Sequence, residues 1–162
     1  MKSVNLGALH ALEIPTRTGS LLVPSACIAE VVPNRALAEL PLSPQWVLGV
    51  MAWRSRPVQV ISLEALMGGA GAATDGVPDP VAGRRQRGTG KVVVFYPLPG
   101  RNPWEFFGVA ACSEPQSRVV DGAVLTGTAD GPDNSIIAMT VRLGQSVLSI
   151  PDMSALSVAL YS

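Results

Sequence analysis

Nucleophiles and bases are too few and too scattered in this chain to predict an active site. Cys27 and Cys112 could act as nucleophiles, but His10 is the only histidine that could serve as a base. The carboxylates show no paired motif, and no nucleophile elbow, P-loop or dinucleotide-binding glycine motif is present. The residues therefore argue against an enzyme.

Metal and cofactor sites are disfavoured as well. Structural zinc takes about four Cys or His ligands, whereas this chain has two cysteines, far apart, and one histidine. Both cysteines lie in apolar sequence, which predicts buried, reduced thiols. The sequence alone does not decide whether Cys27 and Cys112 form a disulfide. We expect no metal and no cofactor.

A basic cluster closes a stretch over 67–90 that is rich in Gly, Ala and Pro. This composition predicts a flexible, exposed loop. The simplest interpretation of the cluster is a solvated flank of a hinge, and the second is a contact for an acidic partner. Nucleic acid comes third, because no aromatic residue is interleaved to stack on bases. The cluster consists of Arg84, Arg85, Arg87 and Lys91.

The overall composition predicts a folded protein without a strong electrostatic field from its net charge. The chain has 162 residues, of which 48% are hydrophobic and 15% charged, and twelve Lys and Arg balance twelve Asp and Glu. Zero net charge removes the usual electrostatic argument for nucleic acid or an anionic membrane. The mean hydropathy is +0.33, but the longest apolar run, 46–53, is far short of the ~20 residues of a membrane span. With no signal-like segment over 1–10, we expect a cytoplasmic protein without direct membrane insertion.

Many punctuating residues, 14 Pro and 16 Gly, indicate many short elements rather than long helices. Short β-leaning runs separated by turn residues have the spacing of a small barrel or sandwich. The expected strands cover 11–14, 21–23, 28–32, 47–53, 58–61, 91–96, 106–111, 136–143 and 147–150, with a hairpin connection over 54–57.

Three short helical segments are expected. Ser62 could cap a helix over 63–67 that ends at Gly68, and Asp152 could cap one over 153–158. A single turn is expected over 35–40. The two capped segments belong to a weak internal repeat, in which 51–66 corresponds to 139–156 as strand, hairpin, strand and short helix. Aligning Arg54 with Arg142 makes the two hairpin loops differ by two residues.

The central stretch over 40–63 resembles the signature of the CheW family. It reads LPLSPQWVLGVMAWRSRPVQVISL, and the family pattern has Leu-Pro, a further Pro, Gly-Val, an apolar stretch, Arg-Gly, Pro-Val and Asp-Leu. Glu30-Val31 is similar to the Glu-Val of the family's upstream segment, and 148–156 is similar to its closing strand and helix. The resemblance covers about 8–162.

Two positions depart from this pattern. Ser55 replaces the family's Gly, at a turn where Gly could be needed for a positive φ, and Ser62 replaces an Asp but can still cap a helix. Trp53-Arg54 and 61–66 look like the divergent branch of type IV pilus chemosensory systems. This divergence bears on whether the chain couples to a kinase in the standard way.

The resemblance implies an all-β fold of two SH3-like, five-stranded β-barrel subdomains with short helices. It implies one domain over 8–162, with a first barrel at about 8–67, a loop over 68–90 and a second barrel over 91–162, sharing of strands being left open. It also implies a non-catalytic adaptor, recruited to membrane receptor arrays. Such an adaptor couples the cytoplasmic tip of a methyl-accepting chemoreceptor to the regulatory domain of a CheA-type histidine kinase.

Three positions match the family's interaction residues. Glu30, Gly49 and Arg54 are the expected protein-binding residues, although Glu30 could be an ordinary surface residue and Arg54 could make an internal hydrogen bond that fixes the barrels. Trp46 and Trp53 favour the core, while Trp104 lies in turn-like sequence and could be an exposed contact. The alternative function is a small β-barrel that binds nucleic acid or serves as another interaction module outside chemotaxis.

Overall fold

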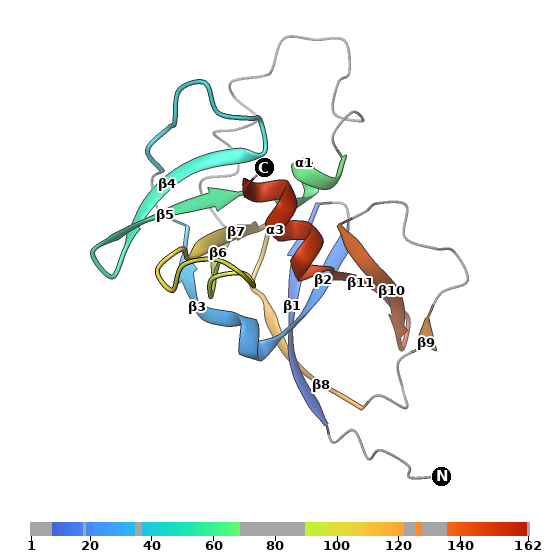
Figure 1. Ribbon diagram of the computed structural model, residues 1–162. Helices are drawn as coiled ribbons and strands as arrows, with labels where there is room; N and C mark the ends of the chain where they lie inside the picture. The colour runs from blue at the N-terminus through green and yellow to red at the C-terminus, as the bar shows by residue number, and fades with distance from the viewer. Residues whose placement is uncertain are drawn as a thin grey trace.

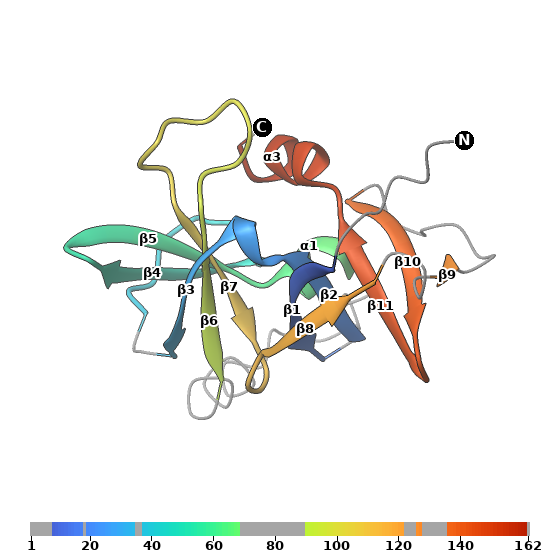
Figure 2. The same cartoon turned by 90° about the horizontal axis from the view of Figure 1, so that it is seen from below.

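A computed structural model of the chain describes residues 8–17, 19–34, 37–68, 90–121, 126–127 and 136–161. The described strands form two sheets that lie side by side (Figures 1 and 2). The six-stranded sheet has the order β8-β1-β2-β11-β10-β9 and the five-stranded sheet the order β3-β6-β7-β5-β4. The strands are β1 (Leu9–Thr16), β2 (Gly19–Pro24), β3 (Ile28–Pro33), β4 (Val47–Trp53), β5 (Arg56–Ile61), β6 (Lys91–Phe95), β7 (Phe107–Ala111), β8 (Gln116–Val120), β9 (Thr126–Gly127), β10 (Ile137–Leu143) and β11 (Ser146–Pro151).

Three short helical elements accompany the sheets: η1 (Ser25–Cys27), α1 (Leu63–Gly68) and α3 (Met153–Tyr161). The structure is therefore mostly β, which confirms the expected fold class. The short strand β9 gives one sheet six strands instead of five. The turn expected over 35–40 is not helical in its described part, because Ala38 forms an isolated antiparallel bridge with Val50. Within the described residues, no helix has the length and apolar character needed to cross a membrane.

The segment over 68–90 does not mark a boundary between the two sheets, because each sheet contains strands from before and after it. Strands β1 and β2 from the first half join β8 to β11, whereas β6 and β7 from the second half join β3 to β5. Among the described strands, four pairings connect the halves: β2 with β11 and β5 with β7 are parallel, and β1 with β8 and β3 with β6 are antiparallel. Each sheet therefore requires strands from both halves of the sequence.

One apolar core joins the two sheets. Leu12, Ile14 and Val23 from the six-stranded sheet pack in the same buried cluster as Val93 and Phe107 from the five-stranded sheet. Burying an aliphatic or aromatic side chain of this size contributes about 1.5–3 kcal/mol. The two sheets consequently share the largest buried cluster, while each also packs a smaller cluster of its own.

The internal repeat is real, with a constant spacing of 90 residues. Both hairpins enclose two-residue turns, because Trp53 pairs with Arg56 and Leu143 pairs with Ser146. Arg54 is therefore equivalent to Gly144, and the expected two-residue difference between the loops was wrong. The pairing register follows the buried faces of the strands and not the identity of the arginines.

Further features of the two hairpins repeat at the same spacing. Each first strand has a bulge, between Val47 and Gly49 in β4 and between Ile137 and Met139 in β10. The residue that precedes each helix caps it, as expected. At α1, the Ser62 hydroxyl accepts a hydrogen bond of 3.2 Å from the Ala65 amide. At α3, the Asp152 carboxylate accepts two hydrogen bonds from backbone amides of the first helical turn.

The two capped helices each reach a hairpin loop of the other sheet. Glu64 of α1 accepts a hydrogen bond of 2.7 Å from the Arg17 amide in the β1–β2 turn. Tyr161 of α3 stacks under the guanidinium of Arg101 in the β6–β7 loop, with 3.6 Å between Cζ and the ring centroid. Figure 2 shows α3 beside this loop, at the junction of the sheets. We call these two contacts the helix clasps.

Candidate functional site

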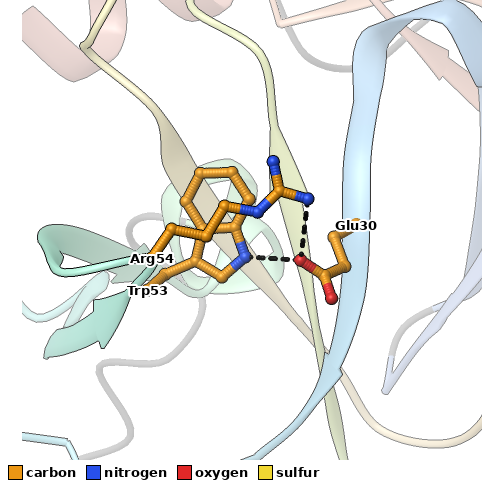
Figure 3. Close-up of polar contacts among 3 residues, drawn as sticks. All are labelled: Glu30, Trp53 and Arg54. Atoms are coloured by element: carbon orange, nitrogen blue, oxygen red, sulfur yellow. Dashed lines mark hydrogen bonds and ion pairs between the residues drawn. The ribbon is translucent and has the colours of Figure 1, made fainter.

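Two of the three expected interaction residues lie together, at the open seam of the five-stranded sheet. Glu30 lies on β3 and Arg54 directly follows β4, and these strands are the two opposite edges of that sheet. Trp53 is the last residue of β4, and Figure 3 shows its side chain beside that of Arg54, both pointing toward Glu30. Glu30, Trp53 and Arg54 are called the seam triad below.

The tight turn after β4 positions Arg54. Because Trp53 pairs with Arg56, only Arg54 and Ser55 form the turn, with φ values of 47° and 62°. Positive φ at both central residues is the feature of the type I′ turn, which suits the right-handed twist of a hairpin. Ser55, in place of the family's Gly, therefore adopts the left-handed conformation that the sequence pattern suggested.

One carboxylate oxygen holds the triad together. Oε2 of Glu30 accepts a hydrogen bond of 2.8 Å from Nε1 of Trp53 and lies 3.4 Å from an Nη atom of Arg54. The Arg54 guanidinium also lies over the Trp53 ring, with 4.4 Å between Cζ and the centroid. The triad thus links two sheet edges through side chains.

The three residues of the seam triad differ in how far their side chains are exposed and in which hydrogen-bonding groups are already used. Trp53 is buried, as expected, and its indole N–H is satisfied by Glu30. The Arg54 side chain is 66% exposed and that of Glu30 43%, so solvent screens their ion pair strongly. A cavity of about 270 Å³ opens here, lined by the triad, Val32, Met51 and Ala52. Arg54 combines an internal contact with an accessible guanidinium.

Gly49 lies apart from the triad and has an internal role in the geometry. Its φ is +147°, and an added Cβ would lie 2.6 Å from the Ala38 carbonyl oxygen and 2.9 Å from Cβ of Leu37. The Ala38 and Val50 backbones exchange two hydrogen bonds of 2.8 and 2.9 Å at this point. The absence of a side chain therefore lets the 37–38 segment approach β4.

An aromatic row runs from the triad into the β6–β7 loop. The Trp53 and Phe106 rings lie 4.9 Å apart, and Phe106 and Tyr96 lie 5.8 Å apart, both between centroids and both tilted. These distances are typical of favourable aromatic pairs. We call Trp53, Phe106 and Tyr96 the aromatic row. Sequence reasoning missed it because Tyr96 and Phe106 meet only when β6 and β7 pair.

The cysteines are free. Cys27 is half-buried, and burial raises the pKa of its thiol, whereas Cys112 is exposed. The expectation that both are buried was wrong for Cys112, which follows the last residue of β7 and also lines a larger cavity of about 400 Å³ between 37–48 and α1. No described group of three or more His, Cys, Asp or Glu side chains could hold a metal ion.

Part of the basic cluster is outside the described structure. Arg84, Arg85 and Arg87 lie outside the described residues, as does most of the loop expected over 68–90. Lys91, at the start of β6, forms an ion pair of 3.4 Å with Glu114. Trp46 is half-buried against the main core and Trp104 is exposed.

A comparison with protein-family profiles covers the part of the chain that contains the candidate site. The sequence profile of the CheW-like domain matches residues 12–99, which include the whole seam triad. The chain belongs to the CheW-like domain family. No curated protein sequence matches this CheW-like chain.

A solved structure of similar fold extends the likeness beyond the matched residues. The crystal structure of the scaffolding protein TtCheW from Thermoanaerobacter tengcongensis aligns with a TM-score of 0.67 at 10% identity, over 94% of this chain and 90% of that one. At this identity the likeness shows the fold. Membership of the family supports, in general terms, a role as a chemotaxis scaffold.

Proposed function

We propose that this CheW-like protein is a cytoplasmic adaptor that couples a methyl-accepting chemoreceptor to a CheA-type histidine kinase in a receptor array. The observation that carries the proposal is the seam triad, in which Glu30 and Trp53 fix an arginine that keeps a largely exposed guanidinium. A guanidinium held in one orientation is suited to a carboxylate or carbonyl group on a partner.

The triad separates internal from external roles. Glu30 satisfies the buried Trp53 indole, and Gly49 admits the neighbouring 37–38 segment, so both support the shape of the site. Arg54 is the member with donors to spare, since its single contact with Glu30 is 3.4 Å long. We therefore assign partner contact first to Arg54, with Glu30 as the supporting residue beside it and Gly49 as an internal residue that supports β4 from a separate position.

The binding experiment uses two purified probes, a chemoreceptor signalling tip and a CheA-type regulatory domain from the same organism. Arg54→Glu should weaken retention of at least one probe by about tenfold or more, because it places two carboxylates together at the seam. Arg56→Glu, two residues away and also exposed, is the matched charge-reversal control. Circular dichroism establishes that both variants fold.

Two results would count against the proposal at different levels. Failure of the wild-type protein to retain either probe would contradict the adaptor function itself. Equal binding by wild type and Arg54→Glu would leave the function standing and remove Arg54 from the site. Modest binary affinity is compatible with the proposal, because contacts in an array are multivalent.

We assign the output to the type IV pilus branch on the basis of Trp53-Arg54 and the 61–66 segment. The distinguishing test is the phenotype of a strain that lacks the protein. Loss of twitching with normal swimming supports this branch, and loss of swimming alone contradicts it.

A further inference from the structure

The Trp53 ring is the rigid surface on which the Arg54 guanidinium lies. The contact of Arg54 with Glu30 is long, at 3.4 Å, and solvent screens this exposed pair. The Arg54 Cζ atom, by contrast, lies 4.4 Å from the centroid of a buried ring (Figure 3). Because an arginine side chain has many rotamers, a fixed flat ring beneath the guanidinium restricts the directions in which its donors point.

Phe106 contacts that ring from outside the seam triad. The ring centroids of Phe106 and Trp53 lie 4.9 Å apart, with an angle of 50° between the two planes, an arrangement that favours an aromatic pair. Phe106 is half-buried against the same apolar cluster that contains Trp53. The hydrogen bond to Glu30 fixes one atom of the indole, and the Phe106 ring restricts the tilt of the indole plane.

Strand pairing sets the position of Phe106. This residue directly precedes β7, and the parallel pairing of Phe107 with Gln59 places the start of β7 beside β5. Strand β5 in turn pairs with β4, whose last residue is Trp53. Phe106 lies beyond residues 12–99, which the family profile matches. The signature that singled out Arg54 therefore says nothing about this residue.

Further contacts hold Phe106 in place. Its ring lies 5.8 Å from that of Tyr96, between centroids. The preceding residue, Glu105, donates its amide to the Asn102 carbonyl at 3.0 Å and forms an ion pair of 3.5 Å with Arg101. Arg101 is also the loop residue of the helix clasp with α3. Residues of the second half of the chain thus fix the ring that supports an arginine of the first half.

We infer that Phe106 is a positioning residue for Arg54, acting through the Trp53 ring. Without the Phe106 ring, the indole is freer to tilt and the guanidinium samples more orientations. Arg54 then loses part of its preorganisation for a carboxylate or carbonyl group on a partner. The expected effect on binding rests on the proposed adaptor function, whereas the order of the Arg54 side chain can be measured without a partner.

The first measurement is the heteronuclear NOE of the Arg54 Nε–H group in the purified full-length protein, which reports picosecond-to-nanosecond order. It should fall in Phe106→Ala toward the value of a freely moving arginine, and Phe106→Tyr, which keeps the ring, should retain the wild-type value. Phe106→Leu keeps apolar volume without a ring and should lower the NOE too, which covers the case in which Phe106→Ala does not fold.

Leu143→Ala is the matched control for loss of apolar packing. Leu143 is half-buried against the separate apolar cluster of the six-stranded sheet. As the last residue of β10, it is the repeat equivalent of Trp53. Its truncation should leave the Arg54 NOE unchanged.

The second measurement is a double-mutant cycle on binding. It uses whichever purified probe, the chemoreceptor tip or the CheA-type regulatory domain, Arg54→Ala binds more weakly than wild type. Phe106→Ala alone should weaken this binding by about three- to tenfold, and Phe106→Tyr by less than about twofold. In the Arg54→Ala background, Phe106→Ala should change the affinity by less than about twofold, because a positioning residue acts through the residue that it positions.

The outcomes separate the inference from the function on which it rests. An unchanged Arg54 NOE in the folded Phe106 variants, or effects of Phe106→Ala and Arg54→Ala that simply add, would overturn the inference. Binding of both probes that Arg54→Ala leaves intact would remove the binding role of Phe106 together with that of Arg54. If the wild type binds neither probe, the adaptor function fails, and the NOE alone then supports or overturns the positioning of Arg54.

Discussion

The indole nitrogen of Trp53 donates a hydrogen bond of 2.8 Å to Glu30 across the seam between two sheet edges. These edges have no described backbone pairing with each other, since β3 pairs with β6 and β4 pairs with β5 and with Ala38. The side-chain contact therefore closes the five-stranded barrel at the same point where the protein exposes Arg54. Closure of the barrel and the position of the Arg54 guanidinium both depend on one carboxylate.

The first prediction separates these two roles by stability. Glu30→Ala leaves the buried Trp53 indole without its acceptor and should lower the free energy of unfolding by about 1–3 kcal/mol. Arg54→Ala removes an exposed ion pair and an exposed cation–π contact with Trp53, and should lower it by about 1 kcal/mol or less. Urea denaturation measures both, with Glu114→Ala, at another exposed ion pair, as control. Equal losses for Glu30→Ala and Arg54→Ala would contradict this division.

The β4–β5 turn should be improved by glycine. Ser55 has a φ of 62°, a region that Gly enters without the penalty of a Cβ. Ser55→Gly should raise the free energy of unfolding by about 0.5–1 kcal/mol, and Gly144→Ala, at φ 63° in the equivalent turn, should lower it by a similar amount. Denaturant titration gives both values. A loss of stability in Ser55→Gly would show that the Ser side chain is needed.

The Tyr161 clasp should make stability depend on alkaline pH. Burial, and then the Glu105 carboxylate, raise the pKa of Tyr161 above its ordinary value of 10.0, while Arg101 lowers it. The folded state therefore holds the phenolic proton more tightly, and this stabilisation is present below pH 10 and lost as pH rises through the folded pKa. Melting temperatures from pH 8 to 11 should fall more steeply for wild type than for Tyr161→Phe. Parallel curves would exclude the clasp as the source.

The two cysteines should react at very different rates. Cys112 is exposed, whereas burial raises the pKa of the Cys27 thiol and reduces its thiolate fraction at neutral pH. A chromogenic disulfide reagent should modify one thiol rapidly and the second slowly, and Cys112→Ser should abolish the fast phase. Cys27→Ser is the control and should leave that phase unchanged. Slow reaction of both thiols would contradict the exposure of Cys112.

Cutting the chain within 69–89 should not yield two folded barrels. Fragments 1–79 and 80–162 each lack strands that complete both sheets, and each leaves one side of the shared core uncovered. We expect neither fragment alone to unfold cooperatively, and an equimolar mixture to regain the β-sheet circular dichroism of the intact chain. Cooperative unfolding of either fragment by itself would contradict this.

Much of the fold could be predicted from local sequence. The expected strands of β4 and β5 follow from alternating buried residues, and the caps at Ser62 and Asp152 follow from residue type at a helix start. The sequence analysis missed strand β8, because β8 lies at the edge of the six-stranded sheet and its sequence is largely polar. Arg118 there pairs with Glu13 of β1 at 2.6 Å, a contact between residues far apart in the chain.

The candidate site was predictable only in part. The motif singled out Glu30 and Arg54, which lie in contact, but the contacts that Glu30 makes with Trp53 and Arg54 depend on how two sheet edges meet. Gly49 was expected to contact a partner protein, and in the structure its close neighbour is the protein's own 37–38 segment. The partners of side chains across a sheet seam are set by tertiary packing, which residue spacing does not report.

The repeat also determines how this molecule can connect to others. Each unit contributes strands to both sheets, yet the described residues of the second unit hold no counterpart of the seam triad, because Gly144 stands where the first unit has Arg54. The two hairpin turns are therefore chemically unlike. Under the proposed function, links made through the Arg54 turn have a direction, because the equivalent turn carries a glycine in place of the arginine.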